Sequence, residues 1–123
     1  MSYSQEEKIE FVDKLKSRTK KFALDILALY QSLNKKGEYH IIGNQLLRSA
    51  TSVAANYRAS CRARSKAEFF SKMSIVVEES DESLFWLEVM FEGKLLPEAT
   101  LSPLINESKE ITSIMSSARK NIS

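Results

Sequence analysis

Residues 45–88 read QLLRSATSVAANYRASCRARSKAEFFSKMSIVVEESDESLFWLE and contain two helical patterns with almost no linker between them. Ser65 and Glu68 have the spacing of a capping box, in which each side chain bonds a free backbone N–H group at a helix start. This signal predicts a helix over about 39–64, followed at once by a helix over about 66–92. Because the connection is so short, we expect the two helices to lie side by side and antiparallel.

Charge divides this predicted hairpin into a basic and an acidic half. Six basic side chains and one acid occur over 48–72, whereas six acids and no base occur over 73–92. In an antiparallel pair, Arg48 lies opposite Asp81 and Glu82. Opposite charges on neighbouring helices attract, so we predict structural ion pairs of Arg48 with Asp81 or Glu82.

The segment before the hairpin predicts a long helix over about 5–34. Ser4 with Glu7 forms another capping box at its start. Its apolar side recurs at alternating spacings of three and four, which is typical of a helix with one buried face. We expect Gly37 to lie just beyond its end. The predicted buried residues are Val12, Leu15, Thr19, Phe22, Ile26, Leu29 and Leu33.

The segment after the hairpin predicts one more helix. Gly93 and Pro97 should end the preceding helix, and Ser102 as N-cap before Pro103 is typical of a helix start. Its predicted buried residues are Leu104, Ser108, Ile111, Met115, Ala118 and Ile122. With only three Gly and two Pro in 123 residues, a strand-rich fold is disfavoured. We therefore predict an all-α protein, an up-down-up-down antiparallel four-helix bundle, as a single domain over 1–123.

The helix over 66–92 has more apolar residues than one face can bury. The seam predicted to be buried is Phe70, Met73, Val77, Ser80, Leu84, Leu87 and Phe91. Outside it fall Phe69, Ile75, Val76, Phe85, Trp86, Val89 and Met90. Either this helix is central or its second face meets another subunit. Burying several large side chains gains about 1.5–3 kcal/mol each, so we predict a homo-oligomer.

Composition narrows the protein class. Apolar residues make up 43% and charged residues 28%, within the range of globular proteins. The single cysteine, Cys61, excludes an intrachain disulfide framework and suits a reducing cytoplasm. The first residues include no apolar run typical of a secretory signal, and nothing approaches a membrane span. We therefore expect a cytoplasmic protein.

Two groups of cations are candidates for nucleic-acid binding, although the net charge is only +2. One is Arg58, Arg62, Arg64 and Lys66 around the predicted turn, where guanidinium groups could take phosphate oxygens. The other is the strip Lys14, Arg18 and Lys21 of the first helix. The alternatives are salt bridges for the arginines and an ordinary solvated face for the strip. No aromatic residues interleave the strip, which argues against base stacking there.

Catalysis and metal binding have little support in the sequence. A di-metal bundle needs Glu-x-x-His motifs, and the only histidine, His40, is in none. Cys61 and His40 are far apart in the chain, so a nucleophile–base pair is not indicated, and Cys61 is expected to be a small buried side chain. We predict no catalytic residues, no metal and no cofactor, and therefore no enzyme.

The 45–88 segment resembles the bacterial four-helix-bundle proteins encoded in intervening sequences of large-subunit ribosomal RNA genes, a family with a ribosomal-protein-like label. The accessory variability protein of diversity-generating retroelements resembles this segment too. Many members carry proline where Ala54 stands, and Ala-Glu-Gly where Arg58-Ala59-Ser60 stands. The matching runs are Gln45–Ala50, Ser52–Tyr57, Arg62–Phe69, Glu79–Ser83 and Leu87–Glu88.

The resemblance implies a bundle that assembles into a ring, often a pentamer, with no known enzymatic activity. For the retroelement relatives it implies binding to nucleic acid and to a reverse transcriptase. Two hypotheses follow for this chain. One is an oligomeric scaffold that associates with ribosomal RNA or other nucleic acid through a basic surface. The other is a protein–protein adaptor without nucleic-acid binding.

Overall fold

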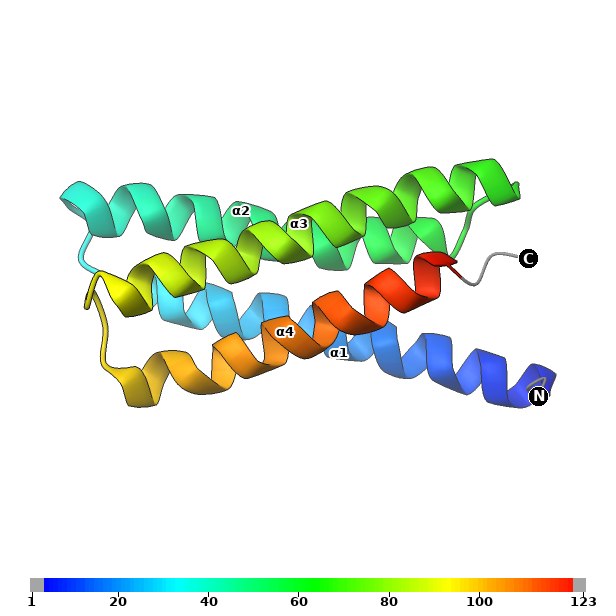
Figure 1. The fold of residues 1–123 in the computed structure, drawn as a ribbon, viewed down its shortest axis with the longest axis horizontal. Coiled ribbons are helices and arrows are strands. Elements are labelled where there is room, and N and C mark those ends of the chain that lie inside the picture. Colours follow the sequence, from blue (N-terminus) through cyan, green and yellow to red (C-terminus); the bar gives the residue numbers. More distant parts are fainter. Residues whose placement is uncertain (1–3, 121–123) are drawn as a thin grey trace.

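Four α-helices make up the described chain of the computed structural model, which covers residues 4–120 (Figure 1). They are α1 Gln5–Ser32, α2 Gly37–Ser60, α3 Lys66–Glu92 and α4 Glu98–Lys120. Each helix runs antiparallel to the one before it, and the described residues contain no strand. The predicted all-α, up-down-up-down four-helix bundle is confirmed. α2 packs against α1 and α3, and α3 also packs against α4, whereas α1 and α4 touch sparingly.

Side-chain caps fix the starts of α1 and α3. The Ser4 hydroxyl accepts the backbone N–H of Glu7 at 3.1 Å, and the Glu7 carboxylate accepts the backbone N–H of Ser4 at 3.3 Å. At α3 the Ser65 hydroxyl accepts the backbone N–H of Glu68 at 3.0 Å. These bonds satisfy donors that the first helical turn leaves unpaired, so the two starts lie where the sequence predicts them.

Three predicted helix boundaries differ from the structure. α1 ends two residues before Asn34, and α2 ends at Ser60 rather than Arg64. Gly37, expected beyond the end of the first helix, is instead the first residue of α2 and has a φ of 57°. Such a left-handed backbone favours glycine, so this residue reverses the chain direction between the two helices.

The predicted start of the last helix is wrong. α4 begins at Glu98, so Pro103 lies inside the helix in its second turn. The carbonyl of Pro97 accepts the backbone N–H groups of Thr100 and Leu101 at 3.0 and 3.2 Å. Leu101 is completely buried, and its burial favours the earlier turn. A proline so near the helix start removes only one intrahelical bond. The predicted seam residue Ile122 lies outside the described residues.

The core follows the predicted seam of α1 but departs from that of α3. The predicted residues from Leu15 to Leu29 of α1 are buried, as is Leu33 just after the helix, and Val12 is half-buried. On α3, Phe70 and Phe91 are exposed, and Val77 and Leu84 are half-buried. The buried residues of α3 are Met73, Val76, Ser80, Ser83, Leu87 and Met90.

Close packing of α2 against α3 explains this rotation of the buried face of α3. The middle of α2 is rich in small residues, which let another helix approach closely. There the Ser83 hydroxyl donates to the Ser49 hydroxyl at 2.9 Å, and both side chains are fully buried. The approach draws the Val76, Ser83 and Met90 side of α3 inward. It leaves the neighbouring column only partly covered, with Val77 and Leu84 half-buried and Phe70 and Phe91 exposed.

A central hydroxyl layer crosses the bundle, because each helix contributes buried hydroxyl groups near its middle. Its members are Thr19, Ser49, Ser80, Ser83 and Ser108. The hydroxyl of Thr19 donates to the Leu15 carbonyl at 2.9 Å, and Ser80 shares a 2.6 Å bond with Thr112. The hydroxyl of Ser108 has no partner within residues 4–120. This layer interrupts an otherwise apolar core.

Replacing Ser108 with alanine should stabilise the bundle by about 1 kcal/mol, because the change removes an unpaired buried hydroxyl and raises helix propensity. Ser49→Ala is the matched control, since it deletes the acceptor of the Ser83 hydroxyl and should cost about 1 kcal/mol. Urea unfolding followed by circular dichroism measures both changes. Equal destabilisation by the two variants would contradict this account of the layer.

Candidate nucleic-acid interface

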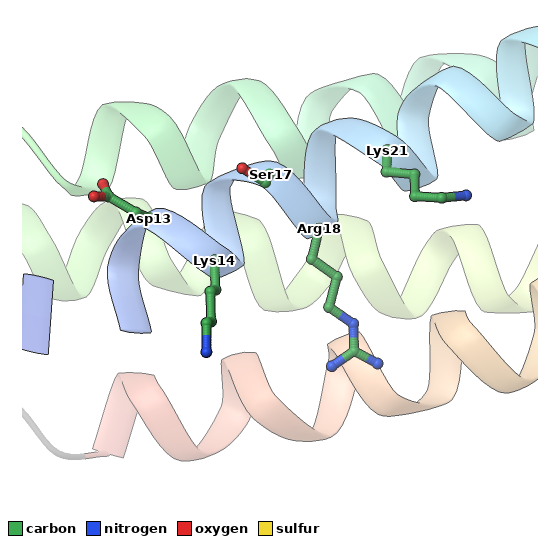
Figure 2. A pocket seen from close by; sticks show the side chains of 5 residues that line it. All are labelled: Asp13, Lys14, Ser17, Arg18 and Lys21. Atoms are coloured by element: carbon green, nitrogen blue, oxygen red, sulfur yellow. The ribbon is translucent and has the colours of Figure 1, made fainter. Parts of the chain in front are cut away.

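The cations of the α1 strip are held in ion pairs. Arg18 extends toward α4 beside a shallow, open hollow on α1 (Figure 2). Its Nε and Nη2 atoms donate to the two carboxylate oxygens of Glu107, both at 2.7 Å, and Nη2 also donates to Glu110 at 2.6 Å. These bonds, that to Glu107 foremost, raise the pKa of the guanidinium despite its partial desolvation.

The two lysines of the strip pair within α1. Lys14 lies 3.0 Å from Glu10, and Lys21 lies 2.9 Å from Asp25, each at a spacing of four residues. The Asp25 bond raises the pKa of Lys21. Such exposed pairs are weak and exchange readily with water. As a group, though, Lys14, Arg18 and Lys21 meet acids of their own chain rather than forming an unopposed basic surface.

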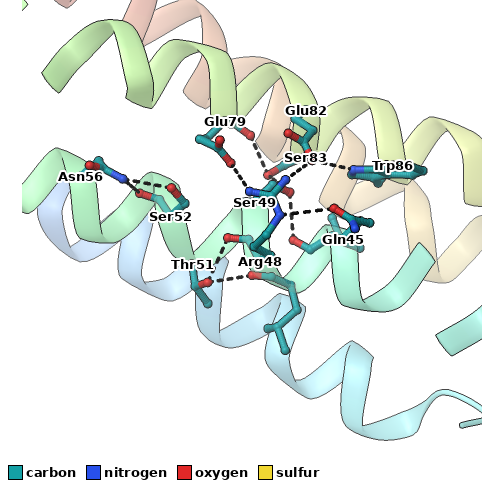
Figure 3. Close-up of polar contacts among 12 residues, drawn as sticks. Gln45, Arg48, Ser49, Thr51, Ser52, Asn56, Glu79, Glu82, Ser83 and Trp86 are labelled. Atoms are coloured by element: carbon teal, nitrogen blue, oxygen red, sulfur yellow. Dashed lines mark hydrogen bonds and ion pairs between the residues drawn. The ribbon is translucent and has the colours of Figure 1, made fainter. Parts of the chain in front are cut away.

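Arg48 joins α2 to α3, as Figure 3 shows. Nη1 donates to Glu79 at 3.0 Å, Nη2 donates to Glu82, and Nε donates to Gln45 at 3.3 Å. The predicted partner Asp81 is exposed and makes no ion pair within residues 4–120. Glu79 and Glu82 are three residues apart and share the side of α3 that faces α2, whereas Asp81 is on its outer side.

Trp86 completes this network. Its indole N–H donates to the same Glu82 oxygen, at 2.9 Å. This bond is the leading cause of the lowered pKa of Glu82, and the bond and charge of Arg48 act in the same direction. The Arg48 side chain is 49% exposed, and those of Glu79 and Glu82 are 20% and 32% exposed. Arg48 therefore serves the fold and contributes little free positive charge.

The cations around the α2–α3 turn differ from Lys14, Arg18 and Lys21 of α1. Arg58, Arg62, Arg64 and Lys66 are exposed, and their side chains make no hydrogen bond or ion pair with residues 4–120. Because α2 ends at Ser60, two of the arginines lie in the turn itself. The structure thus leaves this predicted group accessible and unopposed by partners of its own.

The end of α4 adds further cations beside this turn. α4 finishes at the same end of the bundle as the α2–α3 connection (Figure 1). The guanidinium of Arg119 lies 5.8 Å from the ring centroid of Phe70 on α3. We call this surface the basic end. It comprises Arg58, Arg62, Arg64, Lys66, Lys72, Arg119 and Lys120.

Sequence reasoning missed Arg119 and Lys120 because they lie far along the chain from the turn. The predicted topology contained the signal, since four alternating helices bring the end of the last beside the start of the third. The acids at this end are Glu68 and, on α1, Glu6, Glu7 and Glu10, and they are fewer than the cations. Lys66 at the start of α3 adds to the positive end of the helix dipole.

Features typical of an active site are scarce in the described chain. Two hollows on the surface, one on α1 beside Arg18 and one between α3 and α4, are open to solvent. No three metal-ligating side chains gather among residues 4–120. His40 is exposed and bonds Asn44, while Cys61 is partly buried near Tyr57, whose pKa is raised chiefly by burial. No helix in this part of the chain is long and apolar enough to cross a membrane.

The lowered pKa of Glu82 predicts an acid-sensitive contribution to stability. A carboxyl group whose pKa is lower in the folded state stabilises the fold above its unfolded pKa of about 4.3. That contribution is lost as the pH falls through the folded pKa. Glu82→Gln should therefore reduce the fall in unfolding free energy between about pH 5 and pH 2. Urea unfolding at several pH values measures the slope.

The control for this experiment is Asp81→Asn, which removes a neighbouring acid that makes no ion pair within the described residues. It should leave the wild-type slope nearly unchanged. An equal effect of the two substitutions would mean that general negative charge on α3, rather than the contacts of Glu82, governs the response to acid.

The family model described as 23S rRNA-intervening sequence protein matches residues 7–117. A protein with unknown function from the S23 ribosomal protein family of Bacteroides thetaiotaomicron VPI-5482, known from a crystal structure, is 29% identical in sequence to this chain. The match covers 89% of this chain and 98% of that protein, and the TM-score is 0.80.

No curated protein matches the chain significantly. Neither matching description specifies an enzymatic activity. The likeness to the accessory variability protein of retroelements stays a prediction. The family model spans nearly all of the described bundle and agrees with the resemblance seen in residues 45–88. The chain therefore belongs to the 23S rRNA-intervening sequence protein family.

Proposed function

We propose that this protein is a non-enzymatic, oligomeric scaffold that binds RNA through the basic end. One observation carries the proposal: Arg58, Arg62, Arg64 and Lys66 are exposed and have no acidic partner within residues 4–120. The lone Cys61 suits a cytoplasmic setting for this role.

Phosphate chemistry fits the side chains present. Arginine offers a planar fork of donors for phosphate oxygens, and lysine offers a compact charge. The net charge of +2 is too small for general attraction to a polyanion, so binding depends on the local clustering of charge. Ion pairing of Arg18 and Arg48 supports this choice of surface, because the arginines of the turn, unlike those two, are held by no acid within residues 4–120.

Assembly would multiply weak contacts. Phe85 is 52% exposed and Ile75 is 37% exposed on the outer side of α3, where a second copy could cover them. The family resemblance implies a ring, often of five copies. Several basic ends held in one ring would bind a long polyanion about 100-fold or more tightly than one alone, where the geometry allows simultaneous contact.

The first test removes two charges from the turn. Arg62→Gln combined with Arg64→Gln should weaken binding to a structured ribosomal RNA fragment, measured by fluorescence anisotropy at about 50 and 200 mM salt. Each lost phosphate contact should also make the salt dependence shallower, reducing the magnitude of the negative slope of log affinity against log salt by about 0.7–0.9.

The matched control is Lys36→Gln with Lys94→Gln, which removes the same charge from the opposite end of the bundle. It should leave both affinity and slope close to wild type. Absence of RNA binding by the intact oligomer at about 50 mM salt would reject the proposal. Equal losses from the two double variants would reject the assignment to the basic end.

An adaptor function is the alternative, and a specific observation favours it. Phe85 packs edge-on against Trp86, with ring centroids 4.9 Å apart, and the pair lies among acids that would repel nucleic acid. Exposed aromatic groups with a polar border are typical of protein interfaces. On this reading a protein partner of basic character docks on α3, and the basic end is an ordinary solvated surface.

Oligomerisation has its own test. Phe85→Ser should shift the assembled protein toward the 14.0 kDa monomer in multi-angle light scattering, because it removes apolar area from the outer side of α3. Leu24→Ser, on α1 and 54% exposed, serves as the comparison and should leave the mass unchanged. A wild-type protein that is monomeric at micromolar concentration would refute the assembly. If only Leu24→Ser dissociates the oligomer, the subunit interface lies on α1 and not on α3.

A further inference from the structure

Phe70 is an exposed aromatic ring within the basic end. The sequence seam predicts that it is buried, yet the residue is 50% exposed. It lies one helical turn after Lys66, on the same side of α3, and its ring faces the guanidinium of Arg119 on α4 at 5.8 Å. Cations from two different helices therefore flank one accessible ring.

Exposure of a single phenylalanine is common and argues nothing alone. The surroundings of the ring are the informative part. Phe85 and Phe91 are also exposed on α3, at 52% and 37%, but acids of α3 lie beside them. Glu82 and Glu88 are one turn from Phe85. Glu88 and Glu92 line a hollow together with Phe91, where Lys109 is the single lining cation among residues 4–120. Phosphate groups would be repelled at those two rings and attracted at Phe70.

An aromatic face among cations matches the chemistry of unpaired nucleotides. The faces of bases stack on aromatic side chains, while lysine and arginine hold the neighbouring phosphates. Paired bases inside a duplex keep their faces stacked on one another and cannot reach such a ring. A guanidinium beside the ring can add cation–π attraction to the stack.

We propose that Phe70 stacks on an unpaired base of the bound nucleic acid, with Lys66 and Arg119 holding the adjoining phosphates. The inference rests on the proposed function and narrows its ligand to single-stranded segments, such as loops or unpaired ends. Stacking is indifferent to base identity, so binding prefers unpaired over paired nucleotides without reading a particular sequence.

The test compares single-stranded and duplex probes of equal length, as both RNA and DNA, by fluorescence anisotropy. Wild-type protein should bind the single strands more tightly than the duplexes. Phe70→Leu should weaken single-strand binding about tenfold and leave duplex binding within about twofold. Phe70→Tyr keeps an aromatic face and should retain single-strand affinity.

Phe91→Leu is the matched control, because it changes an exposed phenylalanine at the other end of the same helix. It should leave both affinities unchanged, and thermal unfolding of each variant checks that the bundle is intact. A second readout is the emission of a 2-aminopurine base in the single strand. Stacking on Phe70 should change it on binding to wild type and to Phe70→Tyr, but not to Phe70→Leu.

The outcomes separate this inference from the proposed function. Equal binding of single strands and duplexes, with no effect of Phe70→Leu, would overturn the stacking role and leave RNA binding at the basic end intact. Failure of every probe to bind would reject both. Weakening of duplex and single-strand binding to the same extent by Phe70→Leu would also overturn the inference, since the ring would then act without contacting a base.

Discussion

α2 and α3 approach closely at mid-height, where the hydroxyls of Ser49 and Ser83 meet at 2.9 Å, and most other features of the bundle follow from this contact. Two helices can come so near only where their facing side chains are small. The approach rotates the buried face of α3 and leaves Phe70 and Phe91 exposed, although the sequence pattern places both on the buried side. The α2–α3 connection is short, because α2 ends at Ser60 and α3 begins at Lys66, and its basic side chains are therefore close together.

Two arginines of the chain are held in ion pairs that link neighbouring helices. Arg18 bridges two glutamates three residues apart on α4, and Arg48 bridges two glutamates with the same spacing on α3. Partly exposed pairs of this kind contribute about 1 kcal/mol or less each, far below the burial of the core. Their larger effect is on helix register, because a sliding helix would separate the arginine from both acids at once.

Local signals in the sequence predicted much of the fold. Ser65 with Glu68 gave the start of α3, because a side-chain cap is formed by residues only three apart. The apolar repeat of α1 identified its buried side, since that helix presents one side to the core. Features decided by other helices were missed. The buried side of α3 depends on how closely α2 approaches, and the start of α4 depends on the burial of Leu101.

Some residues of the candidate site could be identified from the local sequence, whereas others are brought to the site only by the fold. The accessible cations of the turn are neighbours in the sequence, so their local clustering pointed to them. Arg119 joins them only through the topology of the bundle. The register of α2 against α3 selects Glu79 over Asp81 as a partner of Arg48, a shift of two residues that antiparallel counting from the turn could not resolve. Side-chain length and helix rotation decide such a choice.

The concentration of cations at one end has a consequence that acts before any contact forms. Acids predominate along the middle and later part of α3, so the molecule is electrically polarised along its length. In the field of a polyanion such a body experiences a torque as well as an attraction. It would arrive with the turn between α2 and α3 leading, and fewer collisions would be wasted on wrong orientations. The rate of association, rather than the lifetime of the complex, would then respond most strongly to ionic strength.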